Sequence, residues 1–143
     1  MNDDEKIFLD TNILVYAFDT SENIKHKKCK KLISDCFEGE RNFYISNQVL
    51  AEFVSVMLTK IKIKYPQEKM KKRIQEINSI DSWKKINYST NTIESLLTKQ
   101  MKTSFWDALI AETMKESLVF TIYTENIKDF EKIEGIKAVN PLK

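Results

Sequence analysis

The stretch that decides the fold is Ile7-Phe8-Leu9-Asp10-Thr11-Asn12-Ile13-Leu14. Its first three residues are apolar and are typical of a short buried strand. The polar residues that follow predict a turn into a helix over residues 11–18. Asp10 therefore stands at the carboxyl end of a strand, which is the edge where open parallel sheets bind ligands. The stretch predicts the start of an α/β unit and makes Asp10 a candidate site residue.

The same alternation of short apolar runs and helical spacing continues to the end of the chain. Strands are predicted at residues 43–45, 85–88, 118–123 and 136–139. Helices are predicted at residues 24–37, 48–64 and 91–101 and from residue 104 to residue 114, with a polar helix or helix-loop over residues 67–80. Strands separated by helices favour βαβ units. We therefore expect an α/β fold with a central, mainly parallel sheet.

Composition limits the domain organisation and the class of protein. The chain has 143 residues, 42% of them hydrophobic and 31% charged, which argues against a disordered chain. It has no internal repeat and no linker rich in Pro, Gly or Ser, so residues 1–143 are expected to form a single domain. Lys plus Arg is 23 and Asp plus Glu is 21, giving a net charge of +2, which excludes a histone-like polybasic protein.

Several kinds of site are excluded by counts of single residue types. Two glycines are too few for a Gly-rich phosphate loop, and one histidine excludes a multi-His zinc site. Cys29 and Cys36 are too few for a disulfide framework, and their spacing predicts core positions on one helix face. The chain starts with acidic residues and has no run near the roughly 20 apolar residues of a membrane span. We expect a cytoplasmic protein with no membrane association.

Acids recur in apolar or strand-end settings further along the chain. Glu52 and Asp107 each stand among apolar neighbours within predicted helices, and Thr124, Glu125 and Asn126 follow the strongest predicted strand. Carboxylates in such settings are costly to bury unless something pairs with them. If they converge they repel one another, and a hard divalent cation resolves the repulsion. Oxygen ligands suit Mg²⁺ or Mn²⁺, which favours phosphodiester hydrolysis over zinc chemistry.

Each of these residues also has a purely structural interpretation. Asp10 could cap the helix that follows it, and Asp107 stands in a position like that of a capping box. Glu52 could be a partly exposed helix residue, and Asn126 and Asp129 could form turns. Caps and turns explain any one of them more easily than they explain the whole set in this order of strands and helices.

Four motifs in this order resemble those of the PIN-domain nucleases. The first is Phe8-Leu9-Asp10-Thr11-Asn12-Ile13-Leu14, a strand ending in Asp-Thr-Asn. The second is Gln48-Val49-Leu50-Ala51-Glu52-Phe53, and the third is Phe105-Trp106-Asp107-Ala108-Leu109-Ile110-Ala111. The fourth is Ile122-Tyr123-Thr124-Glu125-Asn126-Ile127-Lys128-Asp129-Phe130. The resemblance spans residues 7 to about 140 and is strongest to VapC-type toxins of toxin–antitoxin pairs.

The resemblance implies a fold, an activity and partners. The fold would be a three-layer α/β/α sandwich, and the activity that of a ribonuclease dependent on Mg²⁺ or Mn²⁺, an endonuclease cleaving single-stranded or loop RNA. Carried over by position, Asp10, Glu52 and Asp107 would be catalytic and hold the metal. Thr11, Asn12 and Thr124 would shape the pocket or bind substrate. A homodimer and an antitoxin protein would be the partners.

The fourth motif departs from the family's pattern. Relatives often carry an acid where Asn126 stands, and asparagine keeps a carbonyl ligand but loses the charge. Asp129, three residues on, could supply the fourth carboxylate to the metal and to catalysis. Which of the two faces the metal stays open at this point.

Other functions remain as alternatives. The fold could serve as an RNA-binding module or in housekeeping RNA processing, or the acids could belong to another Mg²⁺-dependent phosphoesterase. A haloacid dehalogenase-type phosphatase needs a second Asp two residues after the first, where this chain has Asn12.

Two further features bear on RNA binding. The lysine-rich segments 25–31 and 60–73 could contact phosphates, although a solvated helix face is the favoured interpretation. Phe105 and Trp106 could stack on bases, but their size favours packing in the core.

Overall fold

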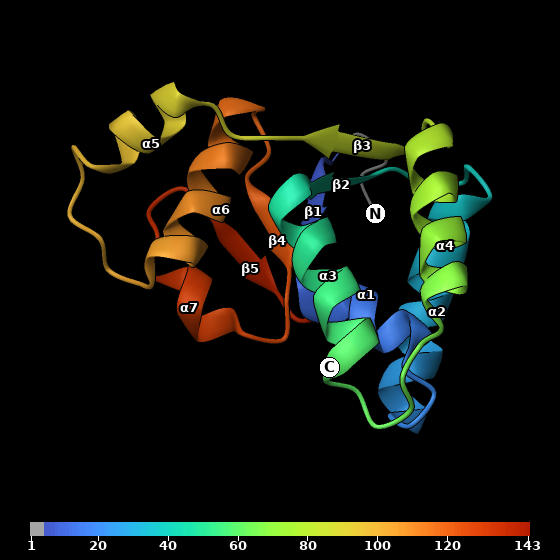
Figure 1. Ribbon diagram of the computed structural model, residues 1–143. Coiled ribbons are helices and arrows are strands. Elements are labelled where there is room, and N and C mark those ends of the chain that lie inside the picture. The colour runs from blue at the N-terminus through green and yellow to red at the C-terminus, as the bar shows by residue number, and fades with distance from the viewer. Residues whose placement is uncertain (1–4) are drawn as a thin grey trace.

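Five short parallel strands form the centre of the structure, a computed structural model that describes residues 5–143 (Figure 1). The strands are β1 (Ile7–Leu9), β2 (Phe43–Ser46), β3 (Trp83–Ile86), β4 (Thr121–Tyr123) and β5 (Lys137–Val139). Their order across the sheet is β3-β2-β1-β4-β5, and every neighbouring pair is parallel. The predicted α/β fold with a parallel sheet is confirmed.

The connections between the strands are helical. The helices in the described residues are α1 (Thr11–Phe18), α2 (Asn23–Phe37), α3 (Asn47–Thr59), α4 (Gln67–Ser79), α5 (Thr90–Leu96), α6 (Phe105–Glu116) and α7 (Ile127–Glu131). Parallel crossovers are right-handed, so connections that run in opposite directions across a sheet cover opposite faces. Helices α1–α4 therefore cover one face and α5–α7 the other, as in the expected sandwich. Figure 1 shows α5, α6 and α7 gathered at one end of the molecule and α2 and α4 at the other.

The strand order reverses its direction at the middle of the sheet. From β1 the chain moves outward to β2 and β3, then returns to the other side of β1 to form β4 and β5. β1 and β4 are hydrogen-bonded neighbours, with Leu9 opposite Tyr123. Open α/β sheets bind ligands at such a reversal, beyond the carboxyl ends of the strands. The residues that follow Leu9 and Tyr123 thus lie where a site is expected.

The core explains why these short strands are stable. Phe8 and Leu9 of β1 and Phe43 and Ile45 of β2 have no exposed surface. Burial of side chains this large is the main favourable term in folding, at about 1.5–3 kcal/mol each. Cys29 and Cys36 are buried as free thiols, as their spacing predicted. Within residues 5–143 no helix combines the length and apolar character needed to cross a membrane.

Two predicted helices are longer than those in the structure. The helix predicted over residues 48–64 ends at Thr59, because the backbone N–H groups of Lys60 and Ile61 both bond to the carbonyl of Val56. The helix predicted over residues 91–101 ends at Leu96, where the next N–H groups turn to carbonyls three residues back. At the end of α5 this tightening of the last turn satisfies carbonyls without extending the helix, whereas at the end of α3 the Ile61 N–H reaches five residues back.

Two predicted strands have different bounds. The strand predicted over residues 85–88 is β3 at Trp83–Ile86, and the strand predicted over residues 118–123 is shortened to Thr121–Tyr123. Leu118 has φ 59°, and the N–H of Val119 bonds back to the carbonyl of Met114. This left-handed residue ends α6, a place where glycine is usual. The apolar run therefore includes a helix end, and Leu118 is 65% exposed.

Candidate active site

An acidic pocket lies at the carboxyl ends of β1 and β4. It has a volume of about 340 Å³. It is lined by Asp10, Thr11, Asn12, Val15, Tyr16, Glu52, Val56, Asp107, Asn126 and Asp129. Seven of the eight predicted site residues line it, and the eighth, Thr124, is hydrogen-bonded to Asp10. The structure thus brings together side chains from the residue after β1, from α1, α3, α6 and α7, and from the segment after β4.

Asp10 is the most buried of the acids and is 8% exposed. Its backbone N–H bonds to the carbonyl of Tyr123, which ties the end of β1 to β4. One carboxylate oxygen accepts from the N–H of Thr11 at 2.8 Å and so caps α1. The other accepts from the hydroxyl of Thr124 at 2.7 Å and from the amide of Asn12 at 3.3 Å. The capping interpretation of Asp10 is therefore correct, and it holds together with a place in the pocket.

Burial raises the pKa of Asp10 above its ordinary value. The hydrogen bonds from Thr124 and Thr11 act in the opposite direction, and the charges of Asp107 and Glu52 raise the pKa further. The last contribution means that the three acids are close enough to repel one another.

The hydroxyl of Thr124 is fully buried behind the pocket. It donates to Asp10 and accepts from the backbone N–H of Asn126 at 2.9 Å. The amide oxygen of Asn12 accepts from the N–H of Glu125 at 3.2 Å. Thr124 and Asn12 thus join the residues after β1 to those after β4 and fix the orientation of the Asp10 carboxylate.

Glu52 enters the pocket from α3. One of its carboxylate oxygens accepts from the Thr11 hydroxyl at 3.0 Å, and the other accepts from the Gln48 amide at 3.3 Å. Gln48 stands one helical turn before Glu52, so the two side chains share a face of α3. Glu52 is exposed, so its carboxylate is held by neighbours and remains accessible.

Asp107 stands in the first turn of α6. Its backbone N–H bonds to the hydroxyl of Ser104, which caps the helix. Partial burial raises the pKa of the Asp107 carboxyl, the bond to Ser104 lowers it, and the charges of Asp129 and Glu52 raise it again. The net direction is upward. Part of this rise in the pKa of Asp107 therefore comes from the negative charges of neighbouring acids.

Asn126 and Asp129 both line the pocket, so the structure does not choose between them. Asn126 directly precedes α7, and Asp129 lies in its first turn. Both are exposed. The charge of Asp129 acts on Asp107, which places a fourth carboxylate on the α6 side of the pocket.

The donor set fits a hard divalent cation. The pocket collects four carboxylates, and no Lys, Arg or His is among the residues that line it in the described part of the chain. Carboxylates without a basic partner repel, and although burial is the main cause of the raised pKa values of Asp10 and Asp107, the charges of the neighbouring acids add to it. Mg²⁺ and Mn²⁺ prefer such oxygen ligands and would remove the repulsion.

Sequence reasoning missed a charged group at the rim of the pocket. The Tyr16 hydroxyl donates to one oxygen of Glu125 at 2.7 Å, and Lys25 forms an ion pair with the other at 2.8 Å. Although burial alone would raise the pKa of Glu125, the bonds from Lys25 and Tyr16 lower it below its ordinary value. The sequence carried no signal for this group, because Tyr16 and Lys25 meet Glu125 only in the folded chain.

The expectation that Phe105 and Trp106 pack in the core is wrong. Phe105 is 37% exposed and Trp106 is 56% exposed. Their positions in the first turn of α6 put them beside Asp107 at the surface, while the residues from Ala108 to Met114 are buried. The first two apolar residues of the motif thus lie at the surface, and the later ones lie in the core.

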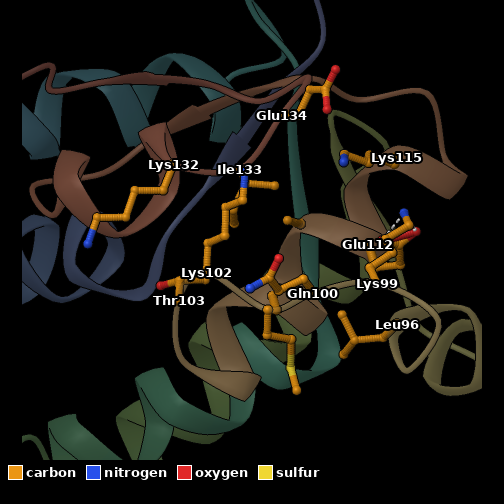
Figure 2. A pocket seen from close by; sticks show the side chains of 13 residues that line it. Leu96, Lys99, Gln100, Lys102, Thr103, Glu112, Lys115, Lys132, Ile133 and Glu134 are labelled. Carbon is orange, nitrogen blue, oxygen red and sulfur yellow. Dashed lines mark hydrogen bonds and ion pairs between the residues drawn. The ribbon is translucent and has the colours of Figure 1, made fainter.

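A lysine-rich hollow of about 510 Å³ is lined by residues of α6 and by the residues that follow α7 (Figure 2). Its lysines are Lys99, Lys102, Lys115 and Lys132. Figure 2 shows them around the hollow, with Lys99 joined to the buried carboxylate of Glu112. Lys132 directly follows α7, whose Asp129 lines the acidic pocket. These lysines are not among the residues that line the acidic pocket.

A second group of acids differs from the pocket in its surroundings. Asp35, Glu38 and Glu40 place carboxylate oxygens within 4.8 Å of one another around the end of α2. Two of the three are exposed, and Asp35 already forms an ion pair with Lys31 at 3.2 Å. Because Lys31 already pairs with this exposed group of acids, the pocket around Asp10 is the better candidate for a metal site.

Comparisons with known proteins identify similar structures. The structure is similar to VapC20 of Mycobacterium tuberculosis, a sarcin–ricin loop cleaving toxin, with TM-score 0.60 and 16% identity over 83% of this chain and 88% of that one. A toxin–antitoxin complex from Klebsiella pneumoniae matches with TM-score 0.62 and 22% identity over 95% and 98%. VapBC2 from Rickettsia felis, bound to a promoter DNA fragment, matches with TM-score 0.58 and 25% identity over 94% and 97%.

Sequence comparison gives the family. A search of curated protein sequences finds no match. The sequence model of the PIN domain family matches residues 7–135, which include the acids of the pocket. Because that match covers most of the 143 residues and the fold agrees with it, the chain belongs to the PIN domain family.

Proposed function

We propose that the protein is a metal-dependent endoribonuclease that works as a single domain. The observation that carries this proposal is the pocket of four carboxylates without a basic residue at the reversal point of the sheet. Membership of the PIN domain family supports it, as does the likeness to an RNA-cleaving toxin.

The proposed ligands of Mg²⁺ or Mn²⁺ are Asp10, Glu52 and Asp107, completed by Asp129 or Asn126. Such an ion, when bound, supplies positive charge for the phosphate and lowers the pKa of a water molecule. Thr124 and Asn12 hold the Asp10 carboxylate in place, and Thr11 and Gln48 hold that of Glu52. These four residues would set the geometry of the ligands, as hydrogen-bonded partners of metal ligands do.

We further propose that RNA is held along its backbone by the lysine-rich hollow. Lys102 and Lys132 are exposed, and no ion pair involving either is found within residues 5–143. Lysine contacts with phosphates give affinity without sequence preference. The strand would then run from the hollow, past α7, to the acids.

The structural neighbours also support a biological setting. The matches from Klebsiella pneumoniae, Rickettsia felis and Salmonella typhimurium are toxin–antitoxin or VapBC complexes. We propose that this chain is likewise the toxin of such a pair, that it forms a homodimer, and that an antitoxin protein covers its acidic pocket.

The test is cleavage of a mixed pool of single-stranded and structured RNA by the purified protein in Mg²⁺, Mn²⁺ or EDTA. We expect cuts that require the metal and that fall at least about 100-fold in the Asp107→Asn variant, a loss of the size seen when one transition-state electrostatic group is removed. Thr113→Val, a change in the buried part of α6, is the control for folding. Full metal-dependent cleavage by Asp107→Asn would refute the assignment.

A further inference from the structure

A second cavity opens beside the acidic pocket. Its volume is about 470 Å³, and Glu52 lines both cavities. The Gln48 amide donates to Glu52 at 3.3 Å and to the backbone carbonyl of Trp106 at 3.4 Å. The boundary between the two cavities is therefore hydrogen-bonded across α3 and α6. A group that fills the second cavity lies directly beside a proposed metal ligand.

One wall of this cavity is the indole of Trp106. It is 56% exposed, although a side chain of this size is usually largely buried. The ring of Phe105 packs against it edge-on, with centroids 5.2 Å apart and planes at 82°. Trp106 is thus held at the surface with much of its aromatic area open to solvent. Unpaired bases of nucleic acids stack on aromatic faces of this kind.

The opposite walls are a second aromatic ring and several amides. Tyr88 packs against the small cluster of Leu96, Ala108 and Leu109, which holds its ring in place. The side chains of Asn47 and Asn87 line the cavity, and within residues 5–143 neither makes a hydrogen bond. Free amides offer both donors and acceptors, as the edge of a nucleobase does.

Within residues 5–143 the lining of the second cavity offers no positive charge to a phosphate. Glu52 is the only acidic side chain among the lining residues in the described part of the chain, and no Lys, Arg or His is among them. The lining therefore favours a neutral, planar group with hydrogen-bonding edges.

We propose that this cavity binds one unpaired nucleobase of the RNA substrate, next to the phosphate that is cleaved. In this assignment Trp106 is the stacking platform and Asn47 and Asn87 contact the edge of the base. The assignment rests on the proposed ribonuclease function and gives it a base-recognition site. Cleavage would then depend on the base at one position beside the cut.

The test combines a protein variant with an altered RNA. Single-stranded oligoribonucleotides that carry the mapped cut site receive an abasic residue at each neighbouring position in turn. We expect one abasic position to raise the wild-type KM by roughly 5- to 150-fold, the range for loss of one stacked base. Trp106→Ala should raise KM similarly on intact RNA and be insensitive to that abasic residue, and Trp106→Tyr should recover most of the affinity.

Phe120→Ala is the matched control. Phe120 is another exposed aromatic residue, 47% exposed, and it directly precedes β4, at the opposite edge of the sheet from the acids. Its replacement should leave both KM values unchanged. If Trp106→Ala lowers cleavage of intact and abasic RNA equally, stacking is refuted. If Trp106→Ala instead changes the sedimenting mass, the surface is an interface between copies and the assignment is also refuted.

A fluorescence titration tests base binding without cleavage. The chain has two tryptophans, and Trp83 is 1% exposed. We expect intact oligoribonucleotide in EDTA to quench the emission of Trp106, and the abasic form or the Trp106→Phe variant to abolish the change. Unchanged emission on saturation with RNA would overturn the assignment. If the wild-type protein cleaves no RNA with Mg²⁺ or Mn²⁺, the proposed function fails, while this titration still decides on the base site.

Discussion

At the scale of single residues, the carboxylate of Asp10 both caps α1 and lines the acidic pocket. Its two oxygens accept hydrogen bonds from Thr11, Thr124 and Asn12 while it lines the acidic pocket. Burial raises its pKa, and the bond from Thr124 is the strongest influence in the other direction. Thr124 is therefore the residue through which the Asp10 carboxylate is most easily disturbed.

Thr124→Val is expected to weaken metal binding without removing a ligand. Valine keeps the shape of the side chain but donates no hydrogen bond to Asp10, so its carboxylate loses both orientation and stabilisation. We expect the Mn²⁺ affinity, measured by calorimetry, to fall roughly 10- to 100-fold. The control is Thr113→Val, because the buried hydroxyl of Thr113 bonds only to the carbonyl of Leu109 in α6. Equal affinities in the two variants would contradict this role of Thr124.

The raised pKa values of Asp10 and Asp107 predict a pH dependence. Both acids have folded-state pKa values above the ordinary 3.8, so the folded protein holds protons more tightly than the unfolded chain. In metal-free buffer the free energy of unfolding should fall as the pH rises from 3.8 through the raised values. Mn²⁺ competes with these protons, so its affinity should fall on acidification, beginning at a pH above that of an ordinary aspartate.

Calorimetric titrations at a series of pH values check this expectation, together with urea unfolding in EDTA. Asp107→Asn removes one of the two groups and should flatten both dependences. A Mn²⁺ affinity that stays constant down to pH 4 would show that the acids do not bind the metal.

The residues of the pocket were predictable because short motifs carry them. Asp10 follows a predicted strand, Asp107 lies at a predicted helix start, and Glu52 stands among apolar residues inside a predicted helix. Tyr16 and Gln48 were not predictable in their roles, because a polar residue inside a helix shows its partner only when another element packs against it. The exposure of Trp106 was also mispredicted, since its motif continues without a break into the buried part of α6.

At the scale of elements, the start of α6 is the feature on which the site depends most. Ser104 caps the helix by accepting from the N–H of Asp107 at 3.2 Å. This bond therefore fixes the start of α6 and, with it, the position of Asp107. A capping serine contributes about 0.5–2 kcal/mol to stability.

Ser104→Ala is expected to lower both stability and metal affinity. Without the cap the first turn of α6 frays, and Asp107 with it. Ser89→Ala is the control, because the Ser89 hydroxyl likewise accepts from the backbone N–H three residues on, and α5 carries none of the predicted site residues. Urea unfolding should show a similar loss in both variants, and only Ser104→Ala should weaken Mn²⁺ binding. Equal weakening in both would mean that general stability controls the site.

The element bounds show where sequence patterns stop being informative. Hydrophobic spacing predicts α3 but not its end at Thr59, because that end is set by bonds to the carbonyl of Val56 and not by a Gly or Pro. β-Propensity predicts a long strand before Tyr123, yet its first residues close α6 through a left-handed Leu118. The conformational preferences of the residues thus predict whether a segment is a helix or a strand, while hydrogen bonds formed in the folded chain decide where it begins and ends.

At the scale of the whole molecule, the charges are distributed unevenly. Of the lysines in residues 25–31, three already have internal partners: Lys25 with Glu125, Lys28 with the carbonyl of Leu142, and Lys31 with Asp35. α4, which holds much of the segment 60–73, lies at the opposite end from α6 and α7 (Figure 1). The hollow around Lys102 and Lys132 is lined by residues of α6 and by Lys132 directly after α7, and these two helices carry Asp107 and Asp129.

The double variant Lys102→Ala with Lys132→Ala is expected to weaken RNA binding and its salt dependence together. Each lost phosphate contact should lower the slope of log affinity against log salt by about 0.7 for a single strand. Fluorescence anisotropy of a labelled oligoribonucleotide across a salt series measures both quantities. Lys71→Ala with Lys72→Ala, on α4, is the control with the same change in net charge. A smaller slope in that control than in the test variant would place the RNA on α4 instead.

The reversal of strand order at β1 and β4 has a consequence for protein synthesis. Asp10 and Glu52 leave the ribosome early, but Asp107 and Asp129 come from elements that complete the sheet only when β4 pairs with β1. A nascent chain that stops before Ser104 has half of the proposed ligands and lacks the strand that orients Asp10. Under the proposed function, a nascent chain would thus have no complete acidic pocket until β4 and α7 have been synthesised.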